Sequence, residues 1–311
     1  MKVLVTGGAG FIGSFLCEKL LVEGHNVICL DNFSTSKKSN IEYFLNNPKF
    51  EFLENDVTKP IELKTDSIFH LASPASPVDY QRLPIETSMA NSVGTFNMLE
   101  LARKNTARFL LASTSEVYGD PLQHPQKESY WGNVNPFGVR SCYDESKRFA
   151  ETLTISFFRK YGLDVRIARI FNTFGPRMRN DDGRAIPNFI VQALLGQPIT
   201  VYGDGEQTRS FCYTSDMIDG LMKLMFTDGL SGQVVNLGNT GERSIISVAR
   251  LIKDLTKSKS KIVFKPLPED DPSRRKPDIT KAKELLNWES KTDFVKGLKK
   301  TIEWFKEELK K

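Results

Sequence analysis

A glycine-rich turn close to the amino terminus limits the possible folds of this chain more than any other feature. Glycines stand at positions 7, 10 and 13, between an apolar run, 3–6, that is typical of a buried strand and a stretch, 11–21, whose pattern predicts a helix. Gly7 permits a tight turn, Gly10 allows the backbone to approach a phosphate, and Gly13 allows the helix to pack closely on the strand. A pyrophosphate would bind at the N-terminus of this helix. The spacing departs from the strict dinucleotide fingerprint, so the turn alone is weak evidence.

A second apolar run, 27–30, ends in Asp31, about twenty residues after the glycine turn. At this place in a nucleotide-binding fold a carboxylate accepts hydrogen bonds from the ribose hydroxyls and repels a 2′-phosphate. Asp31 therefore favours NAD over NADP. The alternative is an ordinary turn residue at the end of a strand.

Two further apolar runs predict strands that end beside the same nucleotide. The run 50–53 leads to Asp56 and Val57, which we expect near the adenine. The run 67–71 leads into Ser73, which we expect beside the pyrophosphate and nicotinamide.

The order of these elements predicts the fold class. Strands alternate with helices over 1–172, which indicates a doubly wound parallel sheet of the Rossmann type that binds NAD. Glycines and prolines divide 173–311 into short elements, which predicts a smaller α/β domain for the substrate. The run 234–238 is expected to rejoin the first sheet. Amphipathic stretches at 84–104 and 144–161 predict helices that pack on the sheet, and we expect them to form a homodimer through a four-helix bundle, with a monomer as the alternative.

Composition excludes several classes of function. The chain has 311 residues, 40% of them hydrophobic and 26% charged, and its net charge of +5 is too small to suggest a nucleic-acid partner. Its four cysteines and three histidines lack the spacing of metal ligands, so we expect no metal and reduced thiols. No apolar run reaches the ~20 residues of a membrane span, and we expect a cytoplasmic protein without a signal peptide. The charged final helix, 294–311, is expected to be a solvated face.

Tyr143 and Lys147 form the pair with the clearest chemical meaning. Of the eight tyrosines only Tyr143 has a lysine four residues later. On a helix the two side chains lie one turn apart on one face, where the ammonium can lower the phenol pKa toward that of a usable base. Tyr143 would then deprotonate a sugar hydroxyl in a hydride-transfer reaction. A chance pair in a lysine-rich protein is the alternative.

The segment 111–120 is predicted to be a strand that runs into a polar loop, at the sheet edge where ligands bind in this architecture. Thr114 is placed to hydrogen-bond the sugar oxygen that Tyr143 serves. Glu116 could act at a neighbouring carbon as a base, an acid or an electrostatic guide. The alternative is that these side chains only cap the next turn.

With these motifs in place, the chain resembles the extended short-chain dehydrogenase/reductase family over essentially all of its length. Within that family it is similar to the branch that decarboxylates UDP-glucuronate to UDP-xylose. The segments that carry the resemblance are 70–77, 113–121, 124–126, 130–136, 142–145, 169–178, 182–184, 200–205, 207–211 and 271–278.

The resemblance implies a reaction in which tightly bound NAD oxidises C4 of the sugar, the resulting β-keto acid loses CO2, and the ketone is reduced again. It implies Thr114, Glu116, Tyr143, Lys147 and Arg275 as catalytic residues, with the neighbouring Arg274 as an alternative to Arg275. For the cofactor, the glycine turn and the resemblance together point to Gly7, Gly10, Phe11, Ile12, Asp31, Asn32, Asp56, Val57, Leu71, Ser73, Tyr143 and Lys147. For the UDP-sugar, the residues are Ser115, Asn172, Arg184, Asn188, Tyr202 beside the uracil, Arg209 and Arg275.

Two departures keep alternatives open. The related 4,6-dehydratases carry an aspartic acid where this chain has Ser115, and a serine hydroxyl is a poor general acid for water loss from C6. Met89 stands where the decarboxylase branch usually has a lysine, so a UDP-hexose 4-epimerase or a dehydratase is the second reading. A non-catalytic NAD-binding protein is a third reading, against which the intact Thr114, Tyr143 and Lys147 argue.

Overall fold

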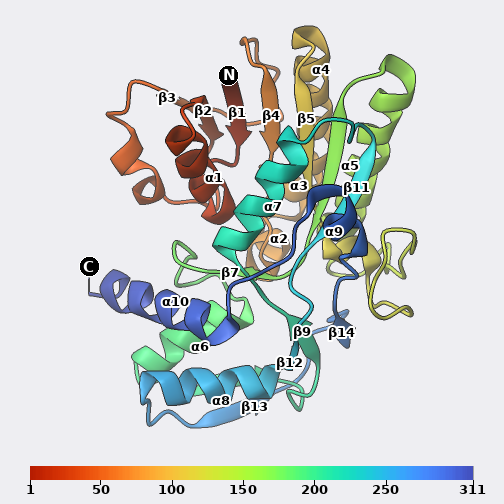
Figure 1. Ribbon diagram of the computed structural model, residues 1–311. Helices are drawn as coiled ribbons and strands as arrows, with labels where there is room; N and C mark the ends of the chain where they lie inside the picture. Colours follow the sequence, from red (N-terminus) through yellow and green to blue (C-terminus); the bar gives the residue numbers. More distant parts are fainter. Residues whose placement is uncertain (311) are drawn as a thin grey trace.

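The computed structural model describes residues 1–310 and is built around one twisted parallel sheet (Figure 1). Seven strands follow the order β11-β6-β5-β4-β1-β2-β3, and every neighbouring pair is parallel. The strands are β1 (Lys2–Thr6), β2 (Asn26–Asp31), β3 (Phe50–Glu54), β4 (Ser67–His70), β5 (Arg108–Thr114), β6 (Val165–Ile170) and β11 (Gln233–Leu237). The predicted doubly wound α/β fold is confirmed.

Helices cover both faces of the sheet, because its strands are apolar on both sides. On one face lie α1 (Phe11–Val22) and α7 (Thr214–Phe226), whose Leu16 and Leu221 enter a core with strands β1 and β11. On the other face lie α4 (Thr95–Asn105) and α5 (Ser141–Tyr161), which are amphipathic as predicted. Burying one leucine or phenylalanine side chain contributes roughly 1.5–3 kcal/mol. These cores fix the carboxyl ends of the strands, where the site lies.

The predicted helix 84–104 is interrupted in the structure. It consists of α3 (Pro84–Met89), a π-helical turn at Ala90–Gly94, and α4. A Cβ on Gly94 would lie 2.6 Å from Cγ2 of Val57, so the glycine permits close contact with the loop after β3. Single π-helical turns inside helices are frequent at functional sites, and this one borders the cavity described below.

The second part of the chain packs around its own apolar core, lower in Figure 1. Its elements are β7 (Thr173–Phe174), α6 (Ala185–Leu194), β8 (Ile199–Tyr202), β9 (Thr208–Ser210), β10 (Cys212–Tyr213), β12 (Glu242–Ser244), α8 (Ile245–Thr256), β13 (Ile262–Lys265), β14 (Arg274–Arg275) and α10 (Phe294–Glu308). The expectation that the final helix is a solvated face is wrong for half of it. Phe294, Leu298, Ile302 and Phe305 of α10 are buried in this core, because they recur on one side of the helix.

The chain crosses back to the main sheet after α7. β11 pairs with β6 in parallel, and α9 (Thr280–Leu286) packs beside it. Asn236 of β11 is fully buried and donates hydrogen bonds to the carbonyl oxygens of Gln126 (3.0 Å) and Asp278 (3.1 Å). It also accepts one from the hydroxyl of Tyr118 (2.8 Å). This strand therefore fastens the loop after β5 and the segment after β14 to the sheet.

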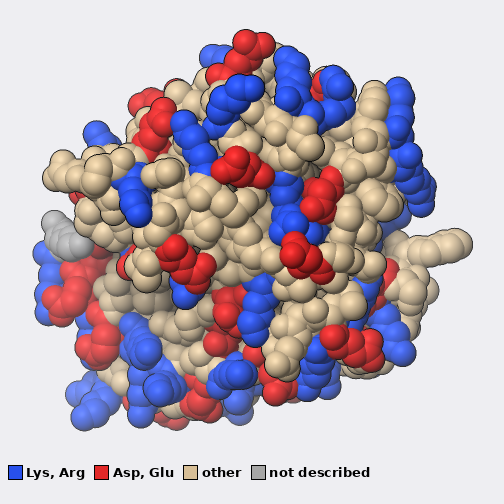
Figure 2. Space-filling model, turned by 45° about the horizontal axis from the view of Figure 1, so that its top comes forward, with Lys and Arg blue, Asp and Glu red and all other residues tan. Residues whose placement is uncertain are grey.

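The surface carries charges of both signs. On the face seen in Figure 2, lysines and arginines are interspersed with acidic residues. Within residues 1–310 no helix combines the length and the apolar character needed to cross a membrane. All four cysteines are free thiols.

Candidate functional site

A cavity of about 760 Å³ lies at the carboxyl ends of the sheet strands, between the sheet and the second part of the chain. The residues that the sequence nominated all line it. They are Gly7, Gly10, Phe11, Ile12, Asp31, Asn32, Asp56, Val57, Leu71, Ser73, Thr114, Ser115, Glu116, Tyr143, Lys147, Asn172, Arg184, Asn188, Tyr202, Arg209 and Arg275. Arg274 is exposed at the surface, and Arg275 is the arginine that faces the cavity.

The glycine turn fits a pyrophosphate. Gly7 has a φ of +69°, and a Cβ at this position would lie 2.9 Å from the backbone of Ala72. A Cβ on Gly13 would lie 2.1 Å from the carbonyl oxygen of Gly7, so α1 can begin this close to the turn only with glycine there. The first backbone N–H groups of α1 are thus held at the cavity wall, where a helix N-terminus attracts a phosphate.

Asp31, at the end of β2, is held in place by three hydrogen bonds. Its carboxylate accepts from the backbone N–H of Ala9 (3.0 Å) and Phe33 (2.9 Å) and from the hydroxyl of Ser36 (2.7 Å). Burial raises the pKa of Asp31, and these hydrogen bonds oppose the rise. A carboxylate offers about four acceptor positions, so one remains for a ribose hydroxyl.

The next stretch of the cavity wall is also preorganised. Asp56 accepts hydrogen bonds from the side-chain amide of Asn32 (3.0 Å) and from both the N–H and hydroxyl of Thr58. These bonds lower the pKa of Asp56 against the opposing effect of burial. Together with the glycine turn and Asp31, this wall provides the donors and acceptors that an adenosine diphosphate requires.

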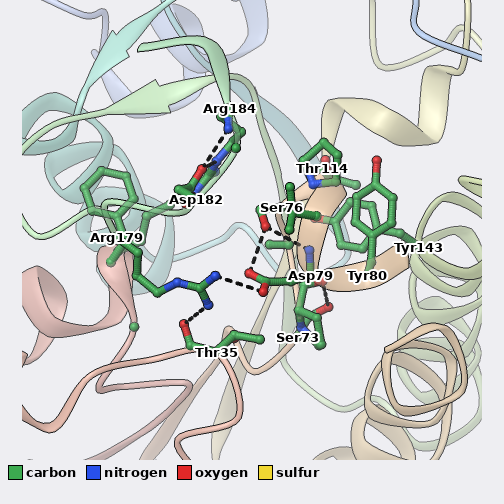
Figure 3. A pocket seen from close by; sticks show the side chains of 18 of the residues that line it. Thr35, Ser73, Ser76, Asp79, Tyr80, Thr114, Tyr143, Arg179, Asp182 and Arg184 are labelled. Carbon is green, nitrogen blue, oxygen red and sulfur yellow. Dashed lines mark hydrogen bonds and ion pairs between the residues drawn. The ribbon is translucent and has the colours of Figure 1, made fainter. Parts of the chain in front are cut away.

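Tyr143 lies in the first turn of α5 and points into the cavity beside Thr114 (Figure 3). The ring of Tyr80 stacks on it, with ring centroids 5.1 Å apart and an angle of 7° between the planes. Burial raises the pKa of the Tyr143 phenol, while a hydrogen bond with Thr114 and the charge of Arg184 act in the opposite direction.

Lys147 lies one turn further along α5, with its Nζ 5.9 Å from the centroid of the Tyr143 ring. It donates a hydrogen bond to the carbonyl oxygen of Ala112 (2.9 Å). Burial lowers the pKa of Lys147 to about 7, although the negative charge of Glu151 opposes the change. The expected lowering of the Tyr143 pKa is therefore not found in the protein alone, because burial acts against the charged form of both partners.

Glu116 is enclosed by two arginines that reach it from different parts of the chain. Arg140, which immediately precedes α5, donates to its Oε2 at 2.5 Å, and Arg275 of β14 pairs with its Oε1. Burial alone would raise the Glu116 pKa, but the two positive charges outweigh it and lower the pKa to about 2. Glu116 is therefore a fixed carboxylate, and in the protein alone it is a poor acid or base.

The charged wall continues beyond Glu116. Asp271 accepts from Arg140 (3.5 Å) and from Arg209 (3.0 Å), so Arg140 bridges two carboxylates. The parallel pairing of β14 with β9 places Arg275 directly opposite Arg209. The resulting arginine cluster, as we name it, consists of Glu116, Arg140, Arg209, Asp271 and Arg275.

A second set of ion pairs lines another part of the cavity (Figure 3). Arg179 donates to the buried carboxylate of Asp79 (2.9 Å) and to the backbone oxygen of Thr35 (2.9 Å). Arg184 forms a double contact with Asp182, at 2.5 and 2.7 Å. These contacts tie the loop after β2, the helix α2 (Pro77–Arg82) and the loop before α6 around one opening.

Sequence reasoning missed several of these residues. Tyr80, Asp79, Arg140 and Arg179 all line the cavity but were not nominated. Arg140 stands three residues before Tyr143, a spacing that places two side chains on one side of a helix start and could have revealed it. No comparable signal marks Asp79, because its partner is 100 residues away.

Several other residues of the cavity wall are uncharged. Asn188 donates to the hydroxyl of Thr200 (3.3 Å), and Tyr202 is partly exposed at the cavity wall. Asn172 lines the cavity from the short connection between β6 and β7. Met89 also lines the cavity and is 42% exposed. Because a methionine side chain is uncharged, this position contributes no charge to the wall.

Comparison with known sequences identifies close relatives. Residues 4–301 match the family described as GDP-mannose 4,6 dehydratase. The chain is 56% identical over 309 residues to UDP-glucuronic acid decarboxylase 4 of Arabidopsis thaliana, covering 99% of this chain and 69% of that protein. It is 54% identical over 308 residues to UDP-glucuronic acid decarboxylase 1 of Xenopus tropicalis, covering 99% and 73%.

Solved structures share the whole fold. UDP-glucuronic acid 4-epimerase from Bacillus cereus, in complex with UDP-glucuronic acid and NAD, is 29% identical with a TM-score of 0.91, covering 99% of both chains. dTDP-glucose 4,6-dehydratase from Bacillus anthracis, in complex with NAD, is 25% identical with a TM-score of 0.87, covering 100% of this chain and 98% of that one. The fold, the cavity and the relatives agree: this chain belongs to the GDP-mannose 4,6 dehydratase family of extended short-chain dehydrogenases/reductases.

Proposed function

We propose that this protein is an NAD-dependent decarboxylase that converts UDP-glucuronate to UDP-xylose and CO2. One observation carries the proposal: the Tyr143–Thr114 pair and an arginine-rich wall share one cavity, in a chain more than half identical to UDP-glucuronic acid decarboxylases. A phenol beside a hydroxyl suits oxidation of a sugar alcohol. An arginine-rich wall suits an acidic sugar.

The chemistry divides between the cofactor and the side chains. NAD, when bound, supplies a hydride acceptor for C4 of the sugar and then the hydride that restores the alcohol. Tyr143 accepts the proton of the 4-hydroxyl, and Thr114 holds that oxygen by a hydrogen bond. The carboxylate then lies β to a ketone, so the C5–C6 bond breaks with loss of CO2, and C5 takes up a proton.

The remaining residues hold the two ligands. In this proposal the cofactor lies on residues 1–172, between the glycine turn and Asp31, with Lys147 beside its ribose. The UDP-sugar lies against 173–311, with arginine forks on its phosphates and Tyr202 near the uracil. A cytoplasmic location is also proposed, supported by the four free thiols.

Ser115 argues against the dehydratase reaction. Its side chain is buried at the cavity wall directly after Thr114. Loss of water from C6 needs a general acid, and a serine hydroxyl has a pKa far above neutrality. Decarboxylation requires no acid at this point.

The direct test is to incubate the purified protein with UDP-glucuronate and NAD, and to follow CO2 and the sugar nucleotides by mass spectrometry and NMR. We expect one CO2 for each UDP-xylose, without net change of NAD. Tyr143→Phe is the control and should release CO2 about 10²- to 10⁴-fold more slowly. UDP-galacturonate without CO2 would identify a 4-epimerase, and turnover of neutral UDP- or dTDP-hexoses alone would identify a dehydratase or hexose epimerase.

We also propose a homodimer through the helices on the outer face of the sheet. Phe96 of α4 and Phe149 of α5 are 47% and 51% exposed, and Phe96 lies against Phe157 in a T-shaped contact. Exposed aromatic rings on adjacent helices favour burial in a partner. Sedimentation of the wild type should give about 70 kDa, twice the chain mass of 35.2 kDa. Phe149→Glu should sediment as a monomer, and a wild-type monomer would refute the proposal.

A further inference from the structure

Asp144 is a buried acid that the reaction described above does not use. It follows Tyr143 on α5, it is 6% exposed, and its Oδ1 has no hydrogen-bond partner. It does not line the main cavity. It lines a smaller one of about 200 Å³, whose wall also includes Arg140, Asp120 and Asp270. Because Arg140 lines both cavities, Asp144 lies directly behind the arginine cluster.

The charge of the arginine cluster depends on its neighbours. Its three arginines face two carboxylates, Glu116 and Asp271, so one positive charge is uncompensated. The other arginines of the cavity are matched by acids: Arg177 by Glu18, Arg179 by Asp79 and Asp181, and Arg184 by Asp182. The cluster is therefore where the cavity can receive a further anion.

An ionised Asp144 would cancel this excess charge. Burial raises the pKa of Asp144 to about 8, the charge of Glu116 raises it further, and Arg140 and Arg275 oppose the rise. Glu145 also acts on it, the phenols of Tyr80 and Tyr143 lie near, and Asp120 and Asp270 face it across the small cavity. A buried carboxyl group whose Oδ1 has no hydrogen-bond partner is costly to ionise, and burial and geometry together favour the neutral acid.

We propose that Asp144, in its protonated form, is a positioning residue for substrate charge: it leaves the arginine cluster with one net positive charge, which receives the carboxylate of the acidic sugar. This inference rests on the proposed function. It also explains how a cavity with Met89 at its wall selects an acidic sugar, since the selective charge comes from the arginine cluster. Ionisation of Asp144 removes that selectivity without disturbing the binding of the nucleotide.

The test measures equilibrium binding in a Tyr143→Phe background, so that the substrate is not consumed. Calorimetry with NAD present gives the affinities for UDP-glucuronate and for UDP-glucose between pH 6.5 and 9.5. The measured quantity is the ratio of the two affinities, because UDP-glucose lacks the carboxylate and reports the titrations that act on the rest of the nucleotide sugar. Lys147 also lines the cavity and titrates in this range, so a fall in the ratio that persists in Asp144→Asn belongs to Lys147. We expect the ratio to fall about tenfold for each pH unit above the pKa of Asp144.

Two variants separate the roles of neighbouring acids. Asp144→Asn mimics the protonated acid and should keep the ratio high and independent of pH. Glu145→Gln, in the next residue, removes a partly exposed acid that pairs with Arg148. It should keep the fall of the ratio with pH and move it to slightly lower pH, because the charge of Glu145 helps to raise the pKa of Asp144. If Asp144→Asn does not fold, Asp144→Ser, which also lacks the titrating acid, takes its place.

The inference is overturned if the ratio stays constant across pH 8 in the parent, or if Asp144→Asn loses selectivity as steeply as the parent does. Failure of the proposed function looks different. In that case the wild type releases no CO2 from UDP-glucuronate at pH 6.5, where Asp144 is protonated, whereas failure of this inference alone leaves that CO2 release intact.

Discussion

Replacing Glu116 by glutamine removes the charge at the centre of the arginine cluster and keeps its shape. In the folded protein the Glu116 pKa falls from 4.5 to about 2, which corresponds to about 3 kcal/mol favouring the ionised folded state. Removing one partner of a buried ion pair typically costs about 3–5 kcal/mol, which agrees with the value obtained from the Glu116 pKa. We expect Glu116→Gln to lower the free energy of unfolding at pH 7 by about 3 kcal/mol, because Arg140 and Arg275 stay buried with too little negative charge.

The pH dependence gives a second check on the same reasoning. The folded pKa is lowered, so the stabilisation is complete above the unfolded pKa and is lost as the pH falls through the folded one. The difference between wild type and variant should therefore narrow as the pH falls from 4.5 toward 2. Urea titrations monitored by circular dichroism and tryptophan fluorescence measure the free energy of unfolding of both proteins at each pH.

A matched control separates the effect of removing a buried charge on stability from the effect of removing an exposed one. Glu100 pairs with Arg103 one turn away on α4, in an exposed ion pair at 2.8 Å. Glu100→Gln should change the free energy of unfolding by less than about 0.5 kcal/mol, as exposed helix pairs do. A Glu116→Gln variant within about 1 kcal/mol of wild type at pH 7 would refute the reasoning, since it would mean that water already compensates the arginines.

Three further predictions follow from the same cavity. Gly13→Ala should abolish NAD retention, because its Cβ would lie 2.1 Å from the oxygen of Gly7; calorimetry should show no binding of added NAD. Tyr143→Phe should lower turnover by about 10²- to 10⁴-fold without weakening UDP-sugar binding, because it removes only the proton acceptor beside Thr114, and steady-state rates with equilibrium binding check this. Wild-type unfolding free energy should contain a component that rises between about pH 7 and 10 and is absent in Lys147→Met. The folded lysine, with its pKa near 7, binds fewer protons than the unfolded one in that range.

Much of the fold could be predicted from the sequence because its determinants are local. The strand, glycine turn and helix at the amino terminus are consecutive, and the Tyr143–Lys147 pair lies within one helical turn. Apolar runs bounded by turn residues predicted the positions of the strands in the parallel sheet. A family resemblance then extended the nominations to residues of the second part, such as Arg275.

The rest depends on contacts between distant segments. Glu116 and Arg275 are separated by 159 residues, and nothing near either one indicates that they neutralise each other. The Tyr143 pKa was expected to be lowered because helical spacing places Lys147 nearby, yet spacing carries no information about burial. The π-helical turn at Ala90–Gly94 lies against Val57 in the loop after β3, a contact that a helix pattern cannot reveal.

The arginine cluster forms only when the second part of the chain packs against the end of the main sheet. Parallel pairing of β14 with β9 sets Arg275 opposite Arg209, and these like charges repel, so that Arg275 helps to lower the Arg209 pKa after burial. The arrangement is stable only because Glu116 arrives from the end of β5 and Asp271 from the loop before β14. Asn236 of β11 fixes both segments by bonding the carbonyl oxygens of Gln126 and Asp278. The charged wall is therefore assembled by the complete fold, and its excess charge is set by carboxylates that only the folded chain brings together.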